Sequence, residues 1–329
     1  MATVHKLIRT HGRDIARAMI PHEEIPYFQI ASSIMEEESN ETGITYSGFC
    51  MTSLPHRRLP DDLPWVRSNG SMSLLIEPGR RPKIKSPRTV ADYELVGVPY
   101  GAKARLILLY LQTEALRNNS PVVELGRSMN NWLERMDISS GGATYREVKN
   151  QAERISRCKL TFDYEGPYGG GMASGHRNDS IVRNAINLRA GDGQGNLWDE
   201  TVQLSDSFFM MLKDHPVPVW EPAIRAISGK SAAIDIYIWL AYRLHVLERP
   251  TQVSWAAVYE QFGAGRQTED DATYRSRLRA FKPEFRRALQ YALSVYEDAV
   301  VQEADDKSGL ILHRSPPAVP ERLIGKIGA

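Results

Sequence analysis

Two segments of this chain carry a local excess of positive charge, although the formal net charge of the whole protein is only +1. Residues 272–287 contain six arginine or lysine side chains and one acidic side chain. Residues 146–159 contain five cations and two acids. Basic side chains on one helix can bind the phosphates of DNA and reach the edges of its bases. The charge pattern therefore indicates a nucleic-acid partner, and it places the main contact on these two segments.

Both segments are expected to be helices, placed in the major groove as the later helix of a helix-turn-helix is. The alternative is a solvated helix face held by ion pairs between residues i and i+4. The glycine-rich residues 166–175 are either a wing that touches DNA or a flexible hairpin loop. The predicted DNA-binding residues are Tyr145, Arg146, Lys149, Asn150, Arg154, Arg157, His176, Arg177, Tyr274, Arg275, Arg277, Arg279, Lys282, Arg286 and Arg287.

The elements that would position these residues occur twice along the chain. The first series predicts, in order, helix 102–117, an extended piece at 122–125, helix 128–135, helix 144–158, and strands at 159–164 and 181–188. The second predicts helix 233–246, an extended piece after Pro250, a helix capped by Ser254, a basic helix at 272–296, and a hairpin of residues 299–303 and 310–313.

One constant offset in residue number relates the two series. The shift that places Pro121 on Pro250 also places the tetrapeptide Ala-Thr-Tyr-Arg at 143–146 on the same tetrapeptide at 272–275. Agreement at several places without gaps argues for a tandem duplication. Because the positive charge falls on the same helix of both copies, DNA binding is favoured over a solvated helix face.

The order of elements is that of a winged helix-turn-helix. The predicted fold class is therefore α+β, with tandem winged helix-turn-helix domains and an N-terminal β-containing extension. Residues 78–88 hold five cations among three prolines and predict an exposed, extended linker. The predicted divisions are a polar arm or loosely docked extension at 1–43, a short-strand extension with the basic linker at 44–95, a first winged-helix domain at 96–215, and a second with a C-terminal tail at 216–329.

The sequence contains no recognised motif for catalysis, for a cofactor or for a metal ion. Gly229-Lys230-Ser231 resembles the end of a phosphate-binding loop, but Ile224 stands where its first glycine is required, so a helix start is predicted instead. The eight histidines are scattered along the chain and the two cysteines are distant, so no metal site and no cofactor is expected. An enzyme with an unrecognised site is the less favoured alternative.

The apolar stretches are far shorter than the ~18 residues that a membrane span needs. The segment Met1 to Ile20 also lacks the apolar core of a secretory signal. We therefore expect a cytoplasmic protein without a membrane partner.

Several short strings resemble those of plasmid-encoded RepA replication initiators. They include Gly97-Val98-Pro99-Tyr100-Gly101, Thr113-Glu114-Ala115, Ser120-Pro121, Gly141-Gly142 and Arg154, together with Leu54-Pro55-His56 and Pro78-Gly79 upstream. The resemblance covers about residues 48–165, and the second half of the chain is similar mainly in layout.

The resemblance implies a non-enzymatic initiator that binds double-stranded DNA repeats (iterons) at a plasmid origin and recruits host replication initiator and helicase proteins. It also implies homodimers that repress the initiator's own promoter, and thereby plasmid copy control. A winged-helix transcriptional repressor is the alternative within DNA binding. The weaker basicity of helix 144–158 leaves open whether it reads bases or forms dimer contacts.

Overall fold

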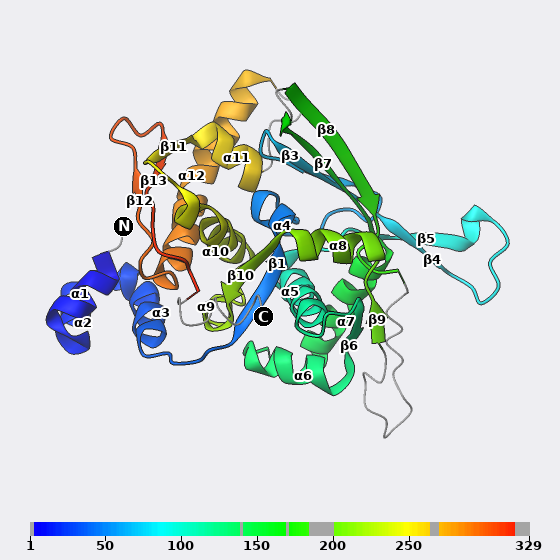
Figure 1. The fold of residues 1–329 in the computed structure, drawn as a ribbon, viewed down its shortest axis with the longest axis horizontal. Helices are drawn as coiled ribbons and strands as arrows, with labels where there is room; N and C mark the ends of the chain where they lie inside the picture. Colours follow the sequence, from blue (N-terminus) through cyan, green and yellow to red (C-terminus); the bar gives the residue numbers. More distant parts are fainter. Residues whose placement is uncertain (1–2, 139–140, 169–170, 184–200, 264–269, 320–329) are drawn as a thin grey trace. The chain divides into compact units, whose positions relative to one another are not determined.

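The computed structural model describes residues 3–138, 141–168, 171–183, 201–263 and 270–319 (Figure 1). The chain divides into two compact units, each of which is described by itself. Residues 44–216 form the central unit, and residues 1–43 together with 217–329 form the terminal unit. The chain passes from one to the other within β1 (Thr42–Tyr46) and again within β10 (Pro216–Trp220). Both units combine helices with antiparallel strands, which confirms the α+β class.

The central unit has α5 (Gly101–Arg117) in its core. This helix is buried almost continuously from Ala104 to Thr113, as its nearly uniform apolar sequence predicted. The other helices of the unit are α4 (Ser47–Met51), α6 (Gly126–Arg135), α7 (Gly142–Arg157) and α8 (Asp206–Asp214), with a 3₁₀ turn at Val90–Asp92. Its strands are β2 (Trp65–Ser68), β3 (Met72–Glu77), β4 (Gly79–Pro82), β5 (Tyr93–Gly97), β6 (Val122–Glu124), β7 (Lys159–Tyr168), β8 (Gly171–Asp179) and β9 (Thr201–Gln203).

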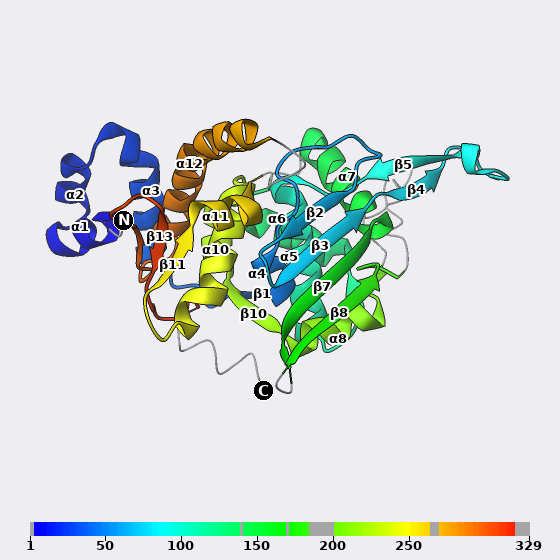
Figure 2. The same cartoon turned by 90° about the horizontal axis from the view of Figure 1, so that it is seen from above.

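Four strands of the central unit form an antiparallel sheet in the order β2-β3-β7-β8 (Figure 2). Leu74 and Ile76 of β3 are fully buried and lie opposite Phe162 and Leu160 of β7. Because alternate residues of a strand face opposite sides, this face of the sheet belongs to the core. Strands β2 and β3 come from the region 44–95, which was predicted as a separate extension. That region and the predicted first domain therefore form one unit.

The predicted linker at residues 78–88 is part of a β-hairpin. Strand β4 pairs with β5, and the 3₁₀ turn closes the far end. In both views this hairpin extends away from the rest of the central unit (Figures 1 and 2). The prediction of exposure is confirmed, but that of an extended linker is wrong because pairing with residues 93–97 supplies hydrogen bonds that the local composition does not reveal.

The glycine-rich segment 166–175 also pairs, where a flexible loop was one of two predictions. Strand β7 reaches Tyr168 and β8 begins at Gly171, with Gly166 opposite Ala173. Ladder hydrogen bonds use the backbone alone, so glycines can take part in them. The predicted strand 181–188 lies mostly outside the described residues, and its described part forms one bridge, between Val182 and Leu204.

The terminal unit has α10 (Ser231–Arg243) at its centre, with residues Ala233 to Ala241 buried. Its other helices are α1 (Thr3–His11), α2 (Arg13–Met19), α3 (Ile25–Met35), α9 (Glu221–Ala226), α11 (Trp255–Phe262) and α12 (Asp271–Ser294), with 3₁₀ turns at His22–Glu24 and Leu244–Val246. Strands β11 (Thr251–Ser254), β12 (Val301–Glu303) and β13 (Gly309–Leu312) form a sheet in the order β11-β13-β12.

Residues 1–43 were predicted to be an irregular arm or loose extension, and the structure corrects this. Their described part, from residue 3 on, forms three α-helices that belong to the terminal unit. His5 is buried, its Nε2 lies 3.2 Å from the carbonyl oxygen of Ser294, and burial lowers its pKa. The Tyr27 ring meets Tyr291 edge-on at 4.7 Å. These helices are short, and only a few apolar residues on each reach the core, so the sequence shows no sustained period.

The two series of elements keep the predicted offset. Strands β6 and β11 begin at 122 and 251, helices α6 and α11 at 126 and 255, and helices α7 and α12 at 142 and 271, so one shift relates all three pairs. The strand pairing differs between the copies, because β6 pairs with β9 whereas β11 pairs with β13. The order of helices and strands is thus repeated, and the sheets built from them are not.

Ser254 caps α11 as predicted, since its side-chain oxygen accepts a hydrogen bond from the amide of Ala257 at 3.2 Å. We expect Ser254→Ala to lower the free energy of unfolding by about 1 kcal/mol, because an amide at the helix start loses its acceptor. Urea unfolding of the full chain measures the change. Ser254→Asp supplies another capping oxygen and is expected to restore stability, so a loss of equal size in both variants contradicts the capping role.

Candidate nucleic-acid interface

Helix α7 turns one face into the central unit. Val148, Ala152 and Ile155 recur at helical spacing and are buried. Gln151 is buried beside them, and its Oε1 accepts a hydrogen bond of 2.8 Å from the amide of Tyr100. Gln151 therefore holds the start of α5 and is not placed to read bases.

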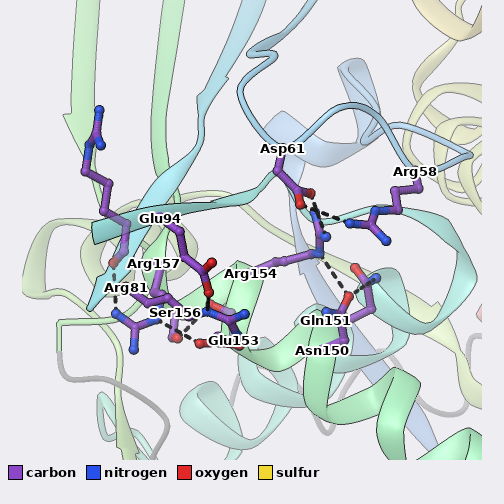
Figure 3. Close-up of polar contacts among 11 residues, drawn as sticks. Arg58, Asp61, Arg81, Glu94, Asn150, Gln151, Glu153, Arg154, Ser156 and Arg157 are labelled. Atoms are coloured by element: carbon purple, nitrogen blue, oxygen red, sulfur yellow. Dashed lines mark hydrogen bonds and ion pairs between the residues drawn. The ribbon is translucent and has the colours of Figure 1, made fainter. Parts of the chain in front are cut away.

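Arg154 belongs to this interior, which corrects its prediction as a DNA contact. Its side chain is only 2% exposed. It donates to Asp61 Oδ1 at 2.9 Å, to the carbonyl oxygen of Val98 at 3.2 Å and to Asn150 Oδ1 at 2.9 Å. Figure 3 shows the guanidinium pointing from α7 towards Asp61. Asn150, also predicted as a base reader, uses its side-chain oxygen to orient this arginine.

Asp61 completes the ion pair from a loop that lies far earlier in the chain. Desolvation acts to raise its pKa, but the hydrogen bonds and charges of Arg154 and Arg58 prevail and hold the pKa below its ordinary value. Gly97 lies against the pair with φ of +75°, and a Cβ there would collide with the Arg154 guanidinium. The pair therefore joins α7 to the loop before β2 and to the end of β5.

The last turn of α7 holds the base of the β4–β5 hairpin, as Figure 3 shows. Arg157 Nη1 donates to the carbonyl oxygen of Arg80 at 2.9 Å. Arg81 of the hairpin binds Glu153 at 2.9 Å and Glu94 at 2.5 Å, and Arg157 lies 3.3 Å from Glu153. Arg157, predicted as a DNA contact, thus has a structural role in this cluster.

The first turns of α7 keep the cations that can meet DNA. Arg146 is exposed and Lys149 is half-buried, and neither forms an ion pair with another described residue. Tyr145 is partly buried, which raises the pKa of its hydroxyl. His176 and Arg177 lie in β8, opposite Asp163 and Phe162, and their side chains fall outside the part of the structure that is described.

Helix α12 is fixed in the terminal unit by a cap and an apolar face. Asp270 accepts hydrogen bonds from the amides of Ala272 and Thr273 at 2.9 and 3.0 Å. Phe285 packs against Trp255 at 5.9 Å, and Leu289 is fully buried. These apolar residues face the core, and the helix continues through Pro283.

Four of the predicted cations of α12 form one stripe. They follow one another at i, i+4, i+7 and i+11, which places them on one face of a helix. In order they are Arg275, Arg279, Lys282 and Arg286. Arg275 and Arg279 are exposed, whereas Lys282 and Arg286 are half-buried.

The last cation of the stripe, Arg286, contacts strand β12 of the terminal unit's sheet. The Arg286 guanidinium binds both carboxylate oxygens of Glu303 in β12, at 3.2 and 2.5 Å. The Arg286 guanidinium carbon lies 4.9 Å from the centre of the Trp255 ring, and Lys282 Nζ lies 5.5 Å from the same ring centre. The hydrogen bond from Arg286 holds the pKa of Glu303 below its ordinary value. Arg286 therefore joins α12 to the hairpin strand, while Arg275 and Arg279 remain on the surface.

The remaining predicted residues of α12 have different surroundings. Tyr274 packs edge-on against Tyr259 at 5.7 Å. Arg277 is exposed and lies off the stripe. Arg287 is hydrogen-bonded to Tyr27 of α3, although desolvation prevails and raises the pKa of that tyrosine.

The residues that the structure describes contain no cluster of three or more histidine, cysteine or acidic side chains that could hold a metal ion. None of their helices is long and apolar enough to cross a bilayer.

Comparison with known proteins places the chain among plasmid replication proteins. A family model described as plasmid-encoded RepA protein matches residues 98–259, the stretch that contains α5, α7, α10 and the first turn of α11. Over these residues the chain is similar to plasmid-encoded RepA proteins, as the sequence resemblance predicted.

No curated protein matches the chain. Among solved structures, a crystal structure of selenomethionine derivatives of domains 2 and 3 of RctB matches with a TM-score of 0.46 and 11% identity, covering 77% of this chain and 85% of that one. A second crystal structure of RctB domains 2-3 matches with a TM-score of 0.43 and 10% identity, covering 80% and 93%.

Proposed function

We propose that this chain initiates plasmid replication by binding double-stranded repeats (iterons) at the origin, with α12 in the major groove. The observation that carries the proposal is the exposed pair Arg275 and Arg279 on a helix whose apolar side is packed into the terminal unit. An arginine can bind a guanine edge through two hydrogen bonds, and a rigid helix holds it in register with the base pairs.

The terminal unit supports a winged helix-turn-helix interpretation. Its elements follow the order α10, β11, α11, α12, β12, β13, and its strands pair in the order β11-β13-β12. In such a domain α12 is the later helix of the helix-turn-helix, and β12 with β13 forms the wing. Because β12 is tied to α12 through Glu303 and Arg286, the proposed wing and groove helix approach DNA as one body.

The central unit supplies the proposed second contact. It repeats the helix order, but β7 pairs with β3 of the preceding region, so its sheet departs from the terminal unit's. We assign its DNA contact to Arg146 and Lys149 in the first turns of α7. Recruitment of host replication initiator and helicase proteins, and autorepression by homodimers, belong to the proposal through the family resemblance.

A footprint of the purified protein on fragments of its own replicon, repeated over a salt series, tests the proposal. We expect protected repeats spaced by one or two helical turns, and an association constant that falls steeply with salt as phosphates are neutralised. Salt-sensitive binding without protected sites contradicts sequence-specific recognition. If the protein does not bind DNA at low salt, the DNA-binding role is overturned and the alternative of an enzyme is favoured.

An origin-dependent plasmid maintenance assay separates an initiator from a transcriptional repressor. The initiator supports replication of a plasmid that carries only the origin and the gene for this chain. A pure repressor protects the same operator sequences and leaves the plasmid unreplicated.

A further inference from the structure

The β4–β5 hairpin, residues 79–97, carries positive charge that its own fold does not neutralise. Its cations are Arg80, Arg81, Lys83, Lys85 and Arg88, and its acids are Asp92 and Glu94. Glu94 binds Arg81. Asp92 Oδ2 accepts hydrogen bonds from the amides of Arg88 and Thr89, both at 2.9 Å. Both acids are therefore used inside the hairpin.

Four cations of the hairpin form no salt bridge with another described residue, although the charge of Lys83 acts on Asp92: Arg80, Lys83, Lys85 and Arg88. They lie on a segment that is exposed almost throughout, and two apolar side chains share it, Ile84 at 51% and Val90 at 72% exposure. Arg80 lies on strand β4, and Lys83, Lys85 and Arg88 follow in the exposed connection between this strand and the 3₁₀ turn. DNA presents one phosphate charge per ~1.7 Å of its axis, so cations grouped on one short segment can meet several phosphates.

The hairpin is held in one conformation before any ligand arrives. The amide of Lys83 donates to the carbonyl oxygen of Asp92 at 2.7 Å, and Lys83 Nζ donates to the carbonyl oxygen of Ala91 at 2.9 Å. Thr89 and Asp92 form a reciprocal cap on the 3₁₀ turn. A segment that is already ordered loses little conformational entropy when it binds.

The direction of the hairpin is fixed at its base by α7. A Cβ on Gly79 would collide with the carbonyl oxygen of Arg157, so backbone meets backbone there with no room for a side chain. The Arg157 and Glu153 contacts described above add side-chain bonds at the same place. The hairpin thus extends from the end of the helix whose first turns hold Arg146 and Lys149.

We propose that the β4–β5 hairpin is a DNA-binding arm that contacts the phosphates and minor groove of duplex DNA beside the site read by the helices. The inference rests on the proposed function, because it takes duplex DNA as the ligand. A two-stranded ribbon fits a groove of DNA, and minor-groove proteins combine lysine or arginine with small apolar wedges. The arm adds affinity that does not depend on base sequence.

The test is the double variant Lys85→Ala/Arg88→Ala of the full chain. Both side chains are exposed, so the fold is expected to persist, and circular dichroism checks this. The matched control is Arg57→Ala/Lys213→Ala, which removes two exposed cations from the same unit. Dissociation constants are measured for a duplex with the protected repeat and for an unrelated duplex, from about 0.05 to 0.2 M salt.

We expect the double variant to bind both duplexes more weakly and by the same factor, with the slope of log K against log salt smaller by about 1.8, or ~0.9 per phosphate contact. The ratio of its dissociation constant to that of the wild type is then about 12-fold larger at 0.05 M than at 0.2 M salt. A slope equal to that of the control overturns the arm.

The outcomes separate the arm from the function on which it rests. If the wild-type protein binds no duplex, the proposed function fails. If the wild type protects its repeats and the double variant does so with equal affinity and slope, only the arm is refuted. If the double variant binds DNA as the wild type does but no longer maintains the plasmid, the DNA-binding arm is also refuted. The hairpin is then assigned to binding an acidic protein surface.

Discussion

Arg275→Ala and Arg279→Ala are each expected to weaken binding to the origin repeat by about 1–3 kcal/mol, or ~5- to 150-fold in dissociation constant. Both side chains lie on the exposed stripe of α12, so each variant removes a groove contact without disturbing the core. Fluorescence anisotropy at one fixed salt concentration, with the repeat and a scrambled duplex, measures the change. Binding to the scrambled duplex is expected to fall less, because phosphate contacts carry no sequence information.

The control for this prediction is Lys6→Ala/Arg17→Ala, which removes two exposed cations from helices α1 and α2 of the same unit. It reports the effect of net charge alone. If the double variant Arg275→Ala/Arg279→Ala and this control bind the repeat equally well, α12 is not the helix that reads bases. Arg277, which lies off the stripe, is expected to have the smaller effect.

Arg154→Ala is expected to lower the free energy of unfolding by about 3 kcal/mol, the lower end of the range for breaking a buried ion pair. The change leaves Asp61 with Arg58 alone, removes the donor to the Val98 carbonyl, and leaves Asn150 Oδ1 with only Gln151 Nε2 at 3.4 Å. Asp61 is 36% exposed, so water screens part of the loss. Urea unfolding followed by circular dichroism measures it. Arg146→Ala, on the exposed side of the same helix, is the control and is expected to change stability by less than ~0.5 kcal/mol.

The same ion pair gives the stability a defined pH dependence. The pKa of Asp61 is lower in the folded chain than in the unfolded one, so its contribution is complete above the unfolded pKa of about 3.9 and is lost as the pH falls through the folded value. The difference between wild type and Arg154→Ala is therefore expected to shrink as the pH is lowered below ~4. A stability difference that is constant down to the acid transition contradicts the assignment.

Periodic and capping signals made the terminal unit's second half predictable. The basic helix at 272–296, the Ser254 cap and the closing hairpin were predicted from local patterns, and each is present in the structure. The constant offset between the two series was readable because the repeated elements start in register. The family resemblance was carried by short strings of residues in the same way.

The roles of the α7 cations could not be read from the sequence. Arg146, Arg154 and Arg157 are chemically equivalent, and their surroundings depend on Asp61 and Arg80, which lie far away in the chain. Helical spacing marks Val148, Ala152 and Ile155 as a buried face, and Arg154 lies next to that face. This was the one available signal that its charge is turned inward.

The attachment of the β4–β5 hairpin to α7 determines which residues stabilise the hairpin. A two-stranded hairpin alone is at best marginally stable in water. Strands β4 and β5 pair with each other and with no third described strand, so the persistence of residues 79–97 derives from Gly79, Arg81 and their contacts with the end of α7. We therefore expect substitutions at Glu153 or Arg157 to act at a distance, on the far tip of the ribbon, because they remove contacts that hold its base.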